Sequence, residues 1–377
     1  MPTVIGPEQR KVSGEAGSDR ERSSDSVTSE RDRDPVSPSV MAMVAPLHPN
    51  DPDWPWITRI GPMRRFHFTR RYIQNTHHRF PKASRVYRQA QYLGSMRSIR
   101  SAAVAFLFST DVGIGLTRWP SRLFPGPRRV YVGFTQDGRW EPKRIMRVRQ
   151  ALQRCDAITI FTEEERRVYL DRYGLSEGQV RLIPLHTDEV NDYRQYPDQT
   201  PIDQPYVVSL GSPNRRFTPV AEVCRERGIR LVVITRPTHV NDSLDDLRRL
   251  GATVITDADK LRALTYLKHA RAAVMVFDDP SLPGGFTTLI HAMFLRTPFI
   301  VSECLGVREH VIDGETGFVT PHDDSDALGE AVERLMQDAE LARQFSRSAH
   351  DRARQRHSLE AAADAFFKLT VDVLRGG

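Results

Sequence analysis

The sequence predicts an α/β protein made of two doubly wound domains. Short apolar runs alternate with longer helical stretches after Ser101, and the same rhythm resumes after a link rich in Pro and Asp, Tyr193–Pro205. Beyond Asp323 only helical patterns remain. Strands that alternate with helices form parallel sheets joined by crossover helices. We therefore expect two Rossmann-like domains that face each other across a cleft, followed by a C-terminal helical segment.

Length and composition agree with this organisation. A chain of 377 residues is too long for one ordinary core, and its net charge of +6 is only mildly basic. Cys155, Cys224 and Cys304 lie far apart, so they indicate neither a disulfide framework nor a metal site. The longest apolar run, Ala102–Phe108, has seven residues, whereas a spanning helix needs about 20. We expect no cofactor and a cytoplasmic protein.

Composition also predicts the domain boundaries. Residues 1–50 are rich in Ser, Glu, Asp, Arg and Pro and are expected to form a disordered tail, since they have little to bury. We expect the working protein to begin near Met41 or Met43, with the preceding residues a dispensable extension or a start-site artefact. The N-terminal domain is expected over 51–195 and the C-terminal domain over 196–356. A last helix over 357–377 is expected to pack back on the N-terminal domain.

A basic segment lies within the N-terminal domain. Between Trp54 and Thr110 there is no Asp or Glu, while basic and aromatic residues are interleaved over 54–100. Three interpretations are open: a solvated basic face, docking on anionic lipid headgroups, or nucleic-acid binding. No nucleic-acid motif accompanies the segment, so nucleic acid is the least favoured partner.

The apolar runs and helical patterns give the expected elements. Strands are predicted at 102–109, 129–134, 157–161, 181–184, 206–210, 231–235, 253–255, 272–277, 299–301 and 317–319. Helices are predicted at 143–154, 163–173, 218–227, 244–250, 260–270, 288–294, 326–336, 339–354 and 359–374.

Candidate ligand residues follow the first strand of the C-terminal domain. Gly211, Arg215 and Arg216 lie between that strand and a helix that starts near Thr218. Ligands bind beyond the carboxyl ends of the strands in doubly wound sheets. Glycine permits close approach of the backbone, and the forked donors of arginine suit a diphosphate. The alternative is an ordinary turn with solvated arginines.

A second candidate loop precedes a helix in the same domain. Gly285 and Phe286 follow a strand end, and the helix opens at Thr287 or Thr288. The positive end of a helix dipole favours an anion, and two hydroxyl groups add donors. His291 lies one helical turn further along the same face. The alternative is a simple capped core helix.

In the N-terminal domain two strands end near carboxylates. Asp111 and Asp137 follow the strands expected at 102–109 and 129–134. Either carboxylate is a candidate to orient a hydroxyl group of a ligand in the cleft, and helix capping or turn formation is the alternative for each.

The run from Gly285 to Asp323 resembles the group 1 (family four type) glycosyltransferases of the GT-B fold. The matching residues are Gly285-Phe286, Ala292-Met293, Thr297-Pro298-Phe299-Ile300 and the segment Gly306-Val307-Arg308-Glu309-His310-Val311-Ile312-Asp313-Gly314-Glu315-Thr316-Gly317. Fainter similarity extends the resemblance over roughly residues 100–375. It implies an acceptor-binding N-terminal domain, a C-terminal domain that binds a nucleotide sugar, and transfer with retention and without a required metal.

The chain departs from the family at its acidic pair. The two positions that are usually acidic, eight residues apart, hold Pro283 and His291, and Asp279 is the nearest upstream carboxylate. The resemblance therefore implies that His291 meets the donor ribose, where a neutral imidazole can accept or donate a hydrogen bond. Arg215 or Arg216 would replace the phosphate-binding basic residues of the family.

These observations together predict a glycosyltransferase that moves a sugar from a nucleoside diphosphate to an acceptor hydroxyl. Polysaccharide or glycolipid assembly is the expected setting, with a saccharide or lipid-linked acceptor at the inner face of the cell membrane. The main alternative is a catalytically degenerate relative that binds a nucleotide sugar or a partner. A sugar-nucleotide epimerase on the same fold and a nucleic-acid-binding protein are the remaining alternatives.

Overall fold

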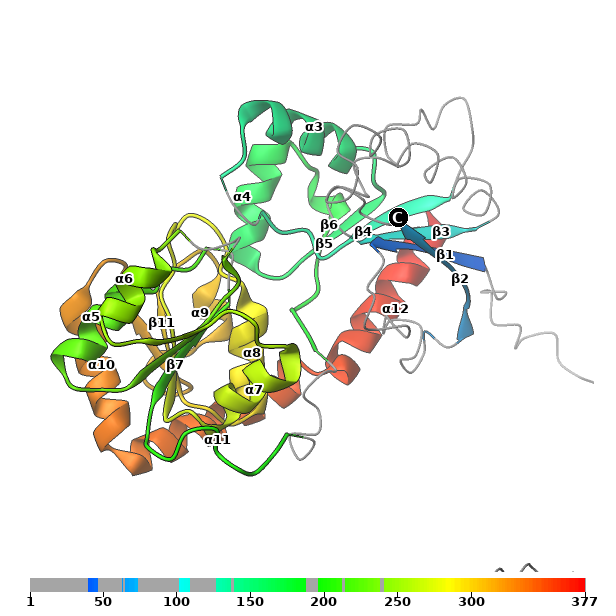
Figure 1. The fold of residues 1–377 in the computed structure, drawn as a ribbon. Coiled ribbons are helices and arrows are strands. Elements are labelled where there is room, and N and C mark those ends of the chain that lie inside the picture. The colour runs from blue at the N-terminus through cyan, green and yellow to red at the C-terminus, as the bar shows by residue number, and fades with distance from the viewer. Residues whose placement is uncertain are drawn as a thin grey trace, which may run out of the picture. The chain divides into compact units, whose positions relative to one another are not determined.

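The computed structural model describes residues 40–46, 63, 65–73, 102–108, 127–136, 139–187, 196–211, 214–237 and 241–376. The chain divides into an N-terminal unit, Met1–Ser37, which lies outside the described residues, and a compact unit, Pro38–Gly377. The compact unit contains two parallel sheets with helices (Figure 1).

The N-terminal sheet has six strands in the order β2-β1-β3-β4-β5-β6. All of its pairings are parallel. The strands are β1 (Val40–Pro46), β2 (His67–Ile73), β3 (Val104–Phe108), β4 (Arg128–Val132), β5 (Ala157–Ile160) and β6 (Val180–Leu182).

Strand β1 lies within the residues that were predicted to form a disordered tail. Residues 40–46 were expected to lie within the tail 1–50, but they pair with both β2 and β3. Their sequence, VMAMVAP, is an apolar run at the end of a charged segment, so it can join a sheet although the residues before it have little to bury. Strand β2 lies inside the basic segment 54–100, and most of the rest of that segment is outside the described residues.

The C-terminal sheet also has six parallel strands, in the order β12-β11-β10-β7-β8-β9. The strands are β7 (Val207–Leu210), β8 (Leu231–Ile234), β9 (Thr253–Ile255), β10 (Ala272–Met275), β11 (Phe299–Ser302) and β12 (Phe318–Thr320). The strand order reverses between β7 and β10, which makes this position the topological switch point of the sheet.

The helices follow the predicted pattern closely. They are α3 (Pro142–Leu152), α4 (Glu163–Tyr173), α5 (Thr218–Glu226), α6 (Leu244–Arg249), α7 (Lys260–His269), α8 (Phe286–Phe294), α9 (Val307–His310), α10 (Ser325–Gln337), α11 (Ala339–Arg356) and α12 (Leu359–Arg375), with a 3₁₀ turn at Glu177–Gln179. Among the described residues, none of them is long and apolar enough to cross a membrane.

Two apolar cores hold the C-terminal sheet between its helices. One core joins α7, α8 and part of α11 to one face of the sheet. The other joins α5, α6, α10 and the start of α11 to the opposite face. Figure 1 shows α5, α6 and α10 on one side of β7 and α7 and α8 on the other. Because both faces are covered, the strands read as continuous apolar runs in the sequence.

Helix α12 leaves the C-terminal sheet and contacts the N-terminal one. The backbone N–H of Thr187 donates to the carbonyl of His357, just before α12 begins. Within the helix, Phe367 lies 5.9 Å from the ring of Phe66, and α12 contacts strand β3. Since α11 packs on the C-terminal core, the α11–α12 pair connects the two sheets.

The N-terminal core contains a buried carboxyl group. Glu165 lies in the first turn of α4, whose N-cap Thr162 accepts a hydrogen bond from the Glu165 backbone N–H. The Glu165 carboxyl accepts from the hydroxyl groups of Thr162 and Tyr169, each at 3.1 Å, and its side chain has no solvent exposure. Burial raises the pKa of Glu165 to about 7, although these hydrogen bonds act in the opposite direction.

This pKa shift predicts a pH-dependent stability. The folded pKa of about 7 lies above the ordinary value of 4.5, so the unfolded chain releases the proton first. The stability contributed by protonated Glu165 is fully present below pH 4.5 and is lost as the pH rises to about 7. The loss is about 3 kcal/mol, taking about 1.4 kcal/mol for each pH unit.

We expect Glu165→Gln to remove that loss. The free energy of unfolding of the variant should decline less than that of the native protein between pH 4.5 and 7, as measured by denaturant unfolding at a series of pH values. The control is Glu330→Gln on α10, which removes an exposed carboxylate. Parallel pH profiles for the native protein and Glu165→Gln would contradict the assignment.

Candidate functional site

Two loops meet at the carboxyl edge of the C-terminal sheet. One follows β7 and leads to α5, and the other follows β10 and leads to α8. Strands β7 and β10 are hydrogen-bonded neighbours at the switch point, so the loops that follow them begin side by side. This is the place where open α/β sheets bind ligands.

The central side chain of this site is Arg215. It is 3% exposed, and its guanidinium lies 4.6 Å from the centre of the Phe277 ring. Its Nη2 donates to the carbonyl of Gly285 at 3.0 Å. Nε and Nη1 are buried and have no hydrogen-bond partner among the described residues. Burial lowers the pKa of Arg215 to about 10, so the guanidinium remains charged at neutral pH.

Burying a cation whose N–H groups lack acceptors is unfavourable unless a ligand supplies those acceptors. Burying a charge without hydrogen bonds costs several kcal/mol. The ring of Phe277 contributes a cation–π attraction of about 2 kcal/mol, and it supplies no acceptor atom for Nε or Nη1. The arrangement therefore fits an anionic ligand that accepts hydrogen bonds from Arg215.

Glycines leave room beside this guanidinium. Gly211 has a φ of +119°, and a Cβ atom there would lie 3.2 Å from Nε of Arg215. A Cβ atom on Gly284 would lie 2.4 Å from the Phe277 ring, so a larger residue would displace the ring under Arg215. Gly285 is the N-cap of α8, and a Cβ atom there would lie 3.5 Å from Nη2 of Arg215.

Helix α8 points its N-terminus into the same region. Its N-cap, Gly285, has no side chain to cap the first turn, and no acidic residue lies in that turn. Thr287 is exposed and Thr288 is half-buried, whereas Phe286 is buried against Phe277 and His310. The structure thus brings Gly211, Arg215, Gly285 and the first turn of α8 together, and it places Phe286 in the core beside them. His291 lies one turn further along α8 and is 7% exposed.

Arg216 lies apart from Arg215. Its backbone N–H donates to the carbonyl of Val276, and its guanidinium pairs with the carboxylate of Asp323. It lines a separate cavity of about 330 Å³ beside α5 and α10, together with Ser302 and Thr320. The side chains of these two adjacent arginines therefore lie in different surroundings.

Sequence reasoning did not single out the residues that join the two loops. Asn214 adopts a φ of +53°, and its side-chain amide bonds both the backbone N–H of Asp279 (2.8 Å) and the backbone carbonyl of Asp279 (3.1 Å). The local signal was an Asn in the loop four residues after the end of β7, since Asn tolerates the left-handed conformation. That signal does not reveal the partner of the Asn214 side chain.

The carboxylate of Asp279 is already occupied. It accepts from Ser281 N at 3.0 Å and Ser281 Oγ at 2.7 Å, and it pairs with Nε of Arg139 at 2.6 Å. Burial alone would raise the pKa of Asp279, but the hydrogen bonds from Arg139 and Ser281 hold it below its ordinary value. Arg139 follows β4 of the N-terminal sheet, and no sequence signal distinguished it from other exposed arginines.

The two N-terminal candidates, Asp111 and Asp137, lie outside the described residues. The described part of the chain contains no group of three or more His, Cys, Asp or Glu side chains that could hold a metal ion. All three cysteines are buried and free.

Comparison with known proteins gives a family match for part of the chain. Residues 217–338 match the family model for group 1 glycosyl transferases. A segment of 76 residues is 33% identical to the alpha-D-kanosaminyltransferase of Streptomyces kanamyceticus, and it spans 20% of this chain and 20% of that protein.

Solved structures share the fold over most of the chain. The sucrose-phosphate synthase of Thermosynechococcus elongatus is 19% identical, with a TM-score of 0.64 over 90% of each chain. HepE of Anabaena, in complex with UDP and glucose, is 12% identical, with a TM-score of 0.68 over 89% of this chain and 100% of that one. Both predictions, the family resemblance and the GT-B-like arrangement of two parallel-sheet domains, are confirmed. The chain has the GT-B fold, and residues 217–338 within it are similar to group 1 glycosyl transferases.

Proposed function

We propose that this protein is a glycosyltransferase that transfers a sugar from a nucleoside diphosphate sugar to an acceptor hydroxyl group. The observation that carries the proposal is the buried guanidinium of Arg215, which has two unused donors at the switch point of the sheet. The group 1 domain match over 217–338 supports the reaction class. The HepE structures that share the fold contain UDP or UDP-glucose, which supports a nucleoside diphosphate as the ligand.

The proposed role of Arg215 is to stabilise the leaving group. During transfer the bond between the anomeric carbon and the diphosphate oxygen breaks, and a bond to the acceptor oxygen forms. Negative charge therefore develops on the diphosphate, next to Arg215 and the N-terminus of α8. Because both are held in place before the reaction, they need little reorganisation as the charge develops.

The remaining contacts with the nucleoside diphosphate sugar are assigned to α8. In this proposal Thr287 and Thr288 donate hydrogen bonds from their hydroxyl groups to the diphosphate, and His291 meets the ribose at the family's second acidic position. Gly211 and Gly285 allow the backbone to approach the phosphates. Arg216 contributes less than Arg215, since its guanidinium is already paired with Asp323.

The acceptor side of the proposal rests on the sequence. Asp111 or Asp137 would orient the acceptor hydroxyl, and transfer would retain the anomeric configuration, as the family resemblance implies. A saccharide or lipid-linked acceptor would be used in polysaccharide or glycolipid assembly. The basic segment 54–100 would hold the enzyme at the cytoplasmic face of an anionic membrane.

A second candidate function is binding without catalysis. Pro283 and His291 replace the acidic pair of the family, and the nearest carboxylate, Asp279, is engaged by Arg139 and Ser281. These observations favour a protein that binds a nucleotide sugar but does not turn it over. Consumption of donor by the purified protein separates the two functions.

Arg215→Ala tests the donor site. We expect UDP, or whichever uridine, guanosine or adenosine diphosphate raises the melting temperature of the native protein, to bind at least about tenfold more weakly, because a charge-assisted hydrogen bond contributes about 1.5–3 kcal/mol. Calorimetric titration measures the affinity. The fold should persist, since the variant removes a buried charge of which Nε and Nη1 have no hydrogen-bond partner among the described residues.

Arg216→Ala is the matched control for this measurement. It removes the same charge from the adjacent position, where the guanidinium pairs with Asp323 on another surface. We expect its affinity for the nucleotide to change less than threefold, given the small contribution of exposed ion pairs. Equal losses in the two variants would show that general charge, and not the buried guanidinium, governs binding.

Substitutions at Asn214 test how the two loops are held. Asn214→Gly should lose the two hydrogen bonds to Asp279, at about 1 kcal/mol each, but it accepts a positive φ without strain. Asn214→Ala should lose a further 1–2 kcal/mol, about the penalty for a left-handed Ala. Thermal unfolding should therefore rank the native protein above the Gly variant, and the Gly variant above the Ala variant. A Gly variant less stable than the Ala variant would refute the conformational argument.

A further inference from the structure

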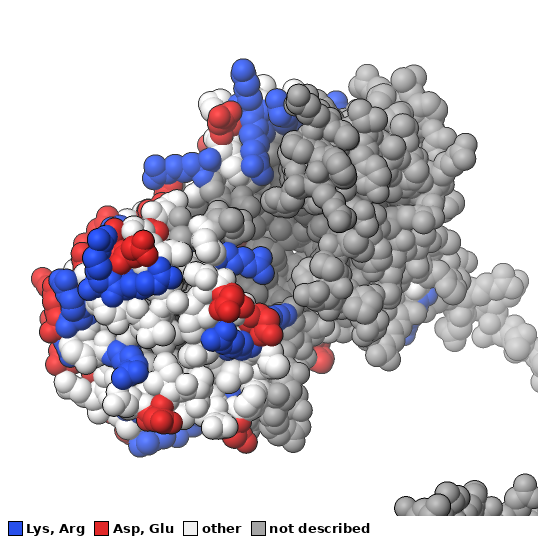
Figure 2. All heavy atoms as spheres, viewed as in Figure 1, with Lys and Arg blue, Asp and Glu red and all other residues white. Residues whose placement is uncertain are grey.

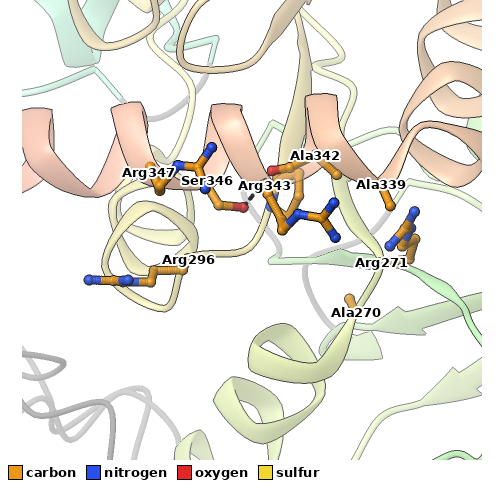
Figure 3. Close-up of a pocket in the computed structure, with 9 residues that line it drawn as sticks. Ala270, Arg271, Arg296, Ala339, Ala342, Arg343, Ser346 and Arg347 are labelled. Carbon is orange, nitrogen blue, oxygen red and sulfur yellow. Dashed lines mark hydrogen bonds between the residues drawn. The ribbon is translucent and has the colours of Figure 1, made fainter.

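A cavity of about 380 Å³ lies at the other end of the C-terminal sheet. Ala270 and Arg271 precede β10, and Pro298 precedes β11, so the cavity lies at the amino ends of these strands. Figure 3 shows it between the end of α7, the loop that follows α8, and one face of α11. The donor site lies beyond the carboxyl ends of the same strands, so the two sites are separated by the length of the sheet.

Arginines dominate the lining of this cavity. Arg271, Arg296, Arg343 and Arg347 line it, and no acidic residue does. The nearest paired carboxylate is Glu340, which binds both Arg343 (2.7 Å) and Arg347 (3.2 Å). One carboxylate between two guanidiniums leaves the cluster with an excess of three positive charges.

The other two arginines have no acidic partner among the described residues. Arg271 donates to the backbone carbonyl groups of Leu335 and Met336 at the end of α10, which fixes its guanidinium at the cavity wall. The Arg296 guanidinium makes no hydrogen bond or ion pair with any part of the chain that the structure describes. In Figure 3 the side chains of Arg271 and Arg343 approach the cavity from opposite elements.

The backbone of Arg296 adds an independent observation. It has a φ of +59° and follows the C-cap of α8, where the N–H of Arg296 bonds the carbonyl of Met293 and the N–H of Thr297 bonds that of Ala292. This is a Schellman motif, whose left-handed position usually holds Gly. A bulky residue there strains the backbone, and strained positions cluster at functional sites.

Small residues form the floor between the arginines. Ala339, Ala342, Arg343, Ser346 and Arg347 lie on one face of α11 by helical spacing, and Ala270 faces them from the end of α7. The short side chains leave open space between the arginines that line the cavity. On the face seen in Figure 2, basic and acidic groups lie side by side near α5 and α6.

We propose that this arginine pocket binds a phosphate-bearing anion, at a site separate from the donor site. Planar guanidinium forks suit the tetrahedral oxygens of a phosphate group, and a cavity of this size holds a diphosphate. The phosphate is carried either by a small soluble molecule or by a lipid headgroup, and both present the same chemistry to the four arginines.

The test uses a variant that removes positive charge from the pocket without straining the fold. Arg296→Gly combined with Arg347→Ala removes two guanidiniums, and glycine relaxes the left-handed position. The matched control, Arg248→Ala with Arg249→Ala, removes two exposed arginines from α6, where each pairs with its own aspartate. Both double variants retain Arg215. The melting temperature of each, without ligand, checks folding, and we expect no decrease for the pocket variant.

The soluble arm titrates inorganic pyrophosphate into the full-length proteins by calorimetry at low ionic strength. We expect the pocket variant to lose a binding event that the native protein and the α6 control retain, or to weaken it by at least about tenfold for each arginine. The lipid arm measures co-flotation with phosphatidylcholine vesicles that contain phosphatidic acid, against phosphatidylcholine alone. A loss confined to the pocket variant in this arm identifies a lipid phosphate as the ligand.

Two results would overturn the proposal. The first is unchanged affinity of the pocket variant for both pyrophosphate and phosphatidic acid vesicles. The second is an equal loss in the α6 control, which would show that net charge alone drives association. Arg215→Ala leaves this pocket intact, so failure of the donor site and failure of the arginine pocket are separate outcomes.

Discussion

The contact of the Arg215 guanidinium with the Phe277 ring and the Gly285 carbonyl joins the two loops on which the site depends. One partner comes from the loop after β7, and the others come from the loop after β10. The same arrangement explains why the surrounding positions are glycines, because a side chain at Gly211 or Gly284 would displace either the cation or the ring beneath it. The buried charge of Arg215 thus restricts the size of the residues at Gly211 and Gly284 and holds the two loops together. It also favours a ligand of negative charge at this edge.

The apolar cores of the sheet help to offset the cost of keeping this cation buried. Both faces of the C-terminal sheet are covered by apolar cores, which hold β7 and β10 in register as neighbours. Burial of apolar area contributes about 25 cal/mol for each Å² removed from water. The carboxyl edge can therefore carry unpaired donors and two residues of unusual backbone, Asn214 and Gly211, without loss of the fold. The amino edge tolerates the strained Arg296 in the same way.

Particular elements show how much the sequence predicted. The helices and strands after Ser101 that fall in the described residues agree with the prediction to within a few residues, since apolar periodicity and capping residues such as Thr162 and Asp259 are local signals. Strand β1 was overlooked, because a short apolar run inside a charged tail has no local feature that reveals its partners β2 and β3. Pairing in a parallel sheet is decided by residues far away in the chain.

By itself the sequence determined the parallel two-domain fold and the sheet edge that holds the candidate site, because strand–helix alternation and glycine-rich strand ends are encoded over a few residues each. It also placed Gly211, Arg215 and the first turn of α8 in that edge. Only the tertiary structure decided between two adjacent arginines: Arg215 turns beneath the loop of Gly285, whereas Arg216 pairs with Asp323. It likewise joined Asn214 to Asp279 and assembled four arginines from three segments around one cavity. The physical reason is that charge pairing and burial depend on residues brought together in space, and a one-dimensional pattern carries no record of those distances.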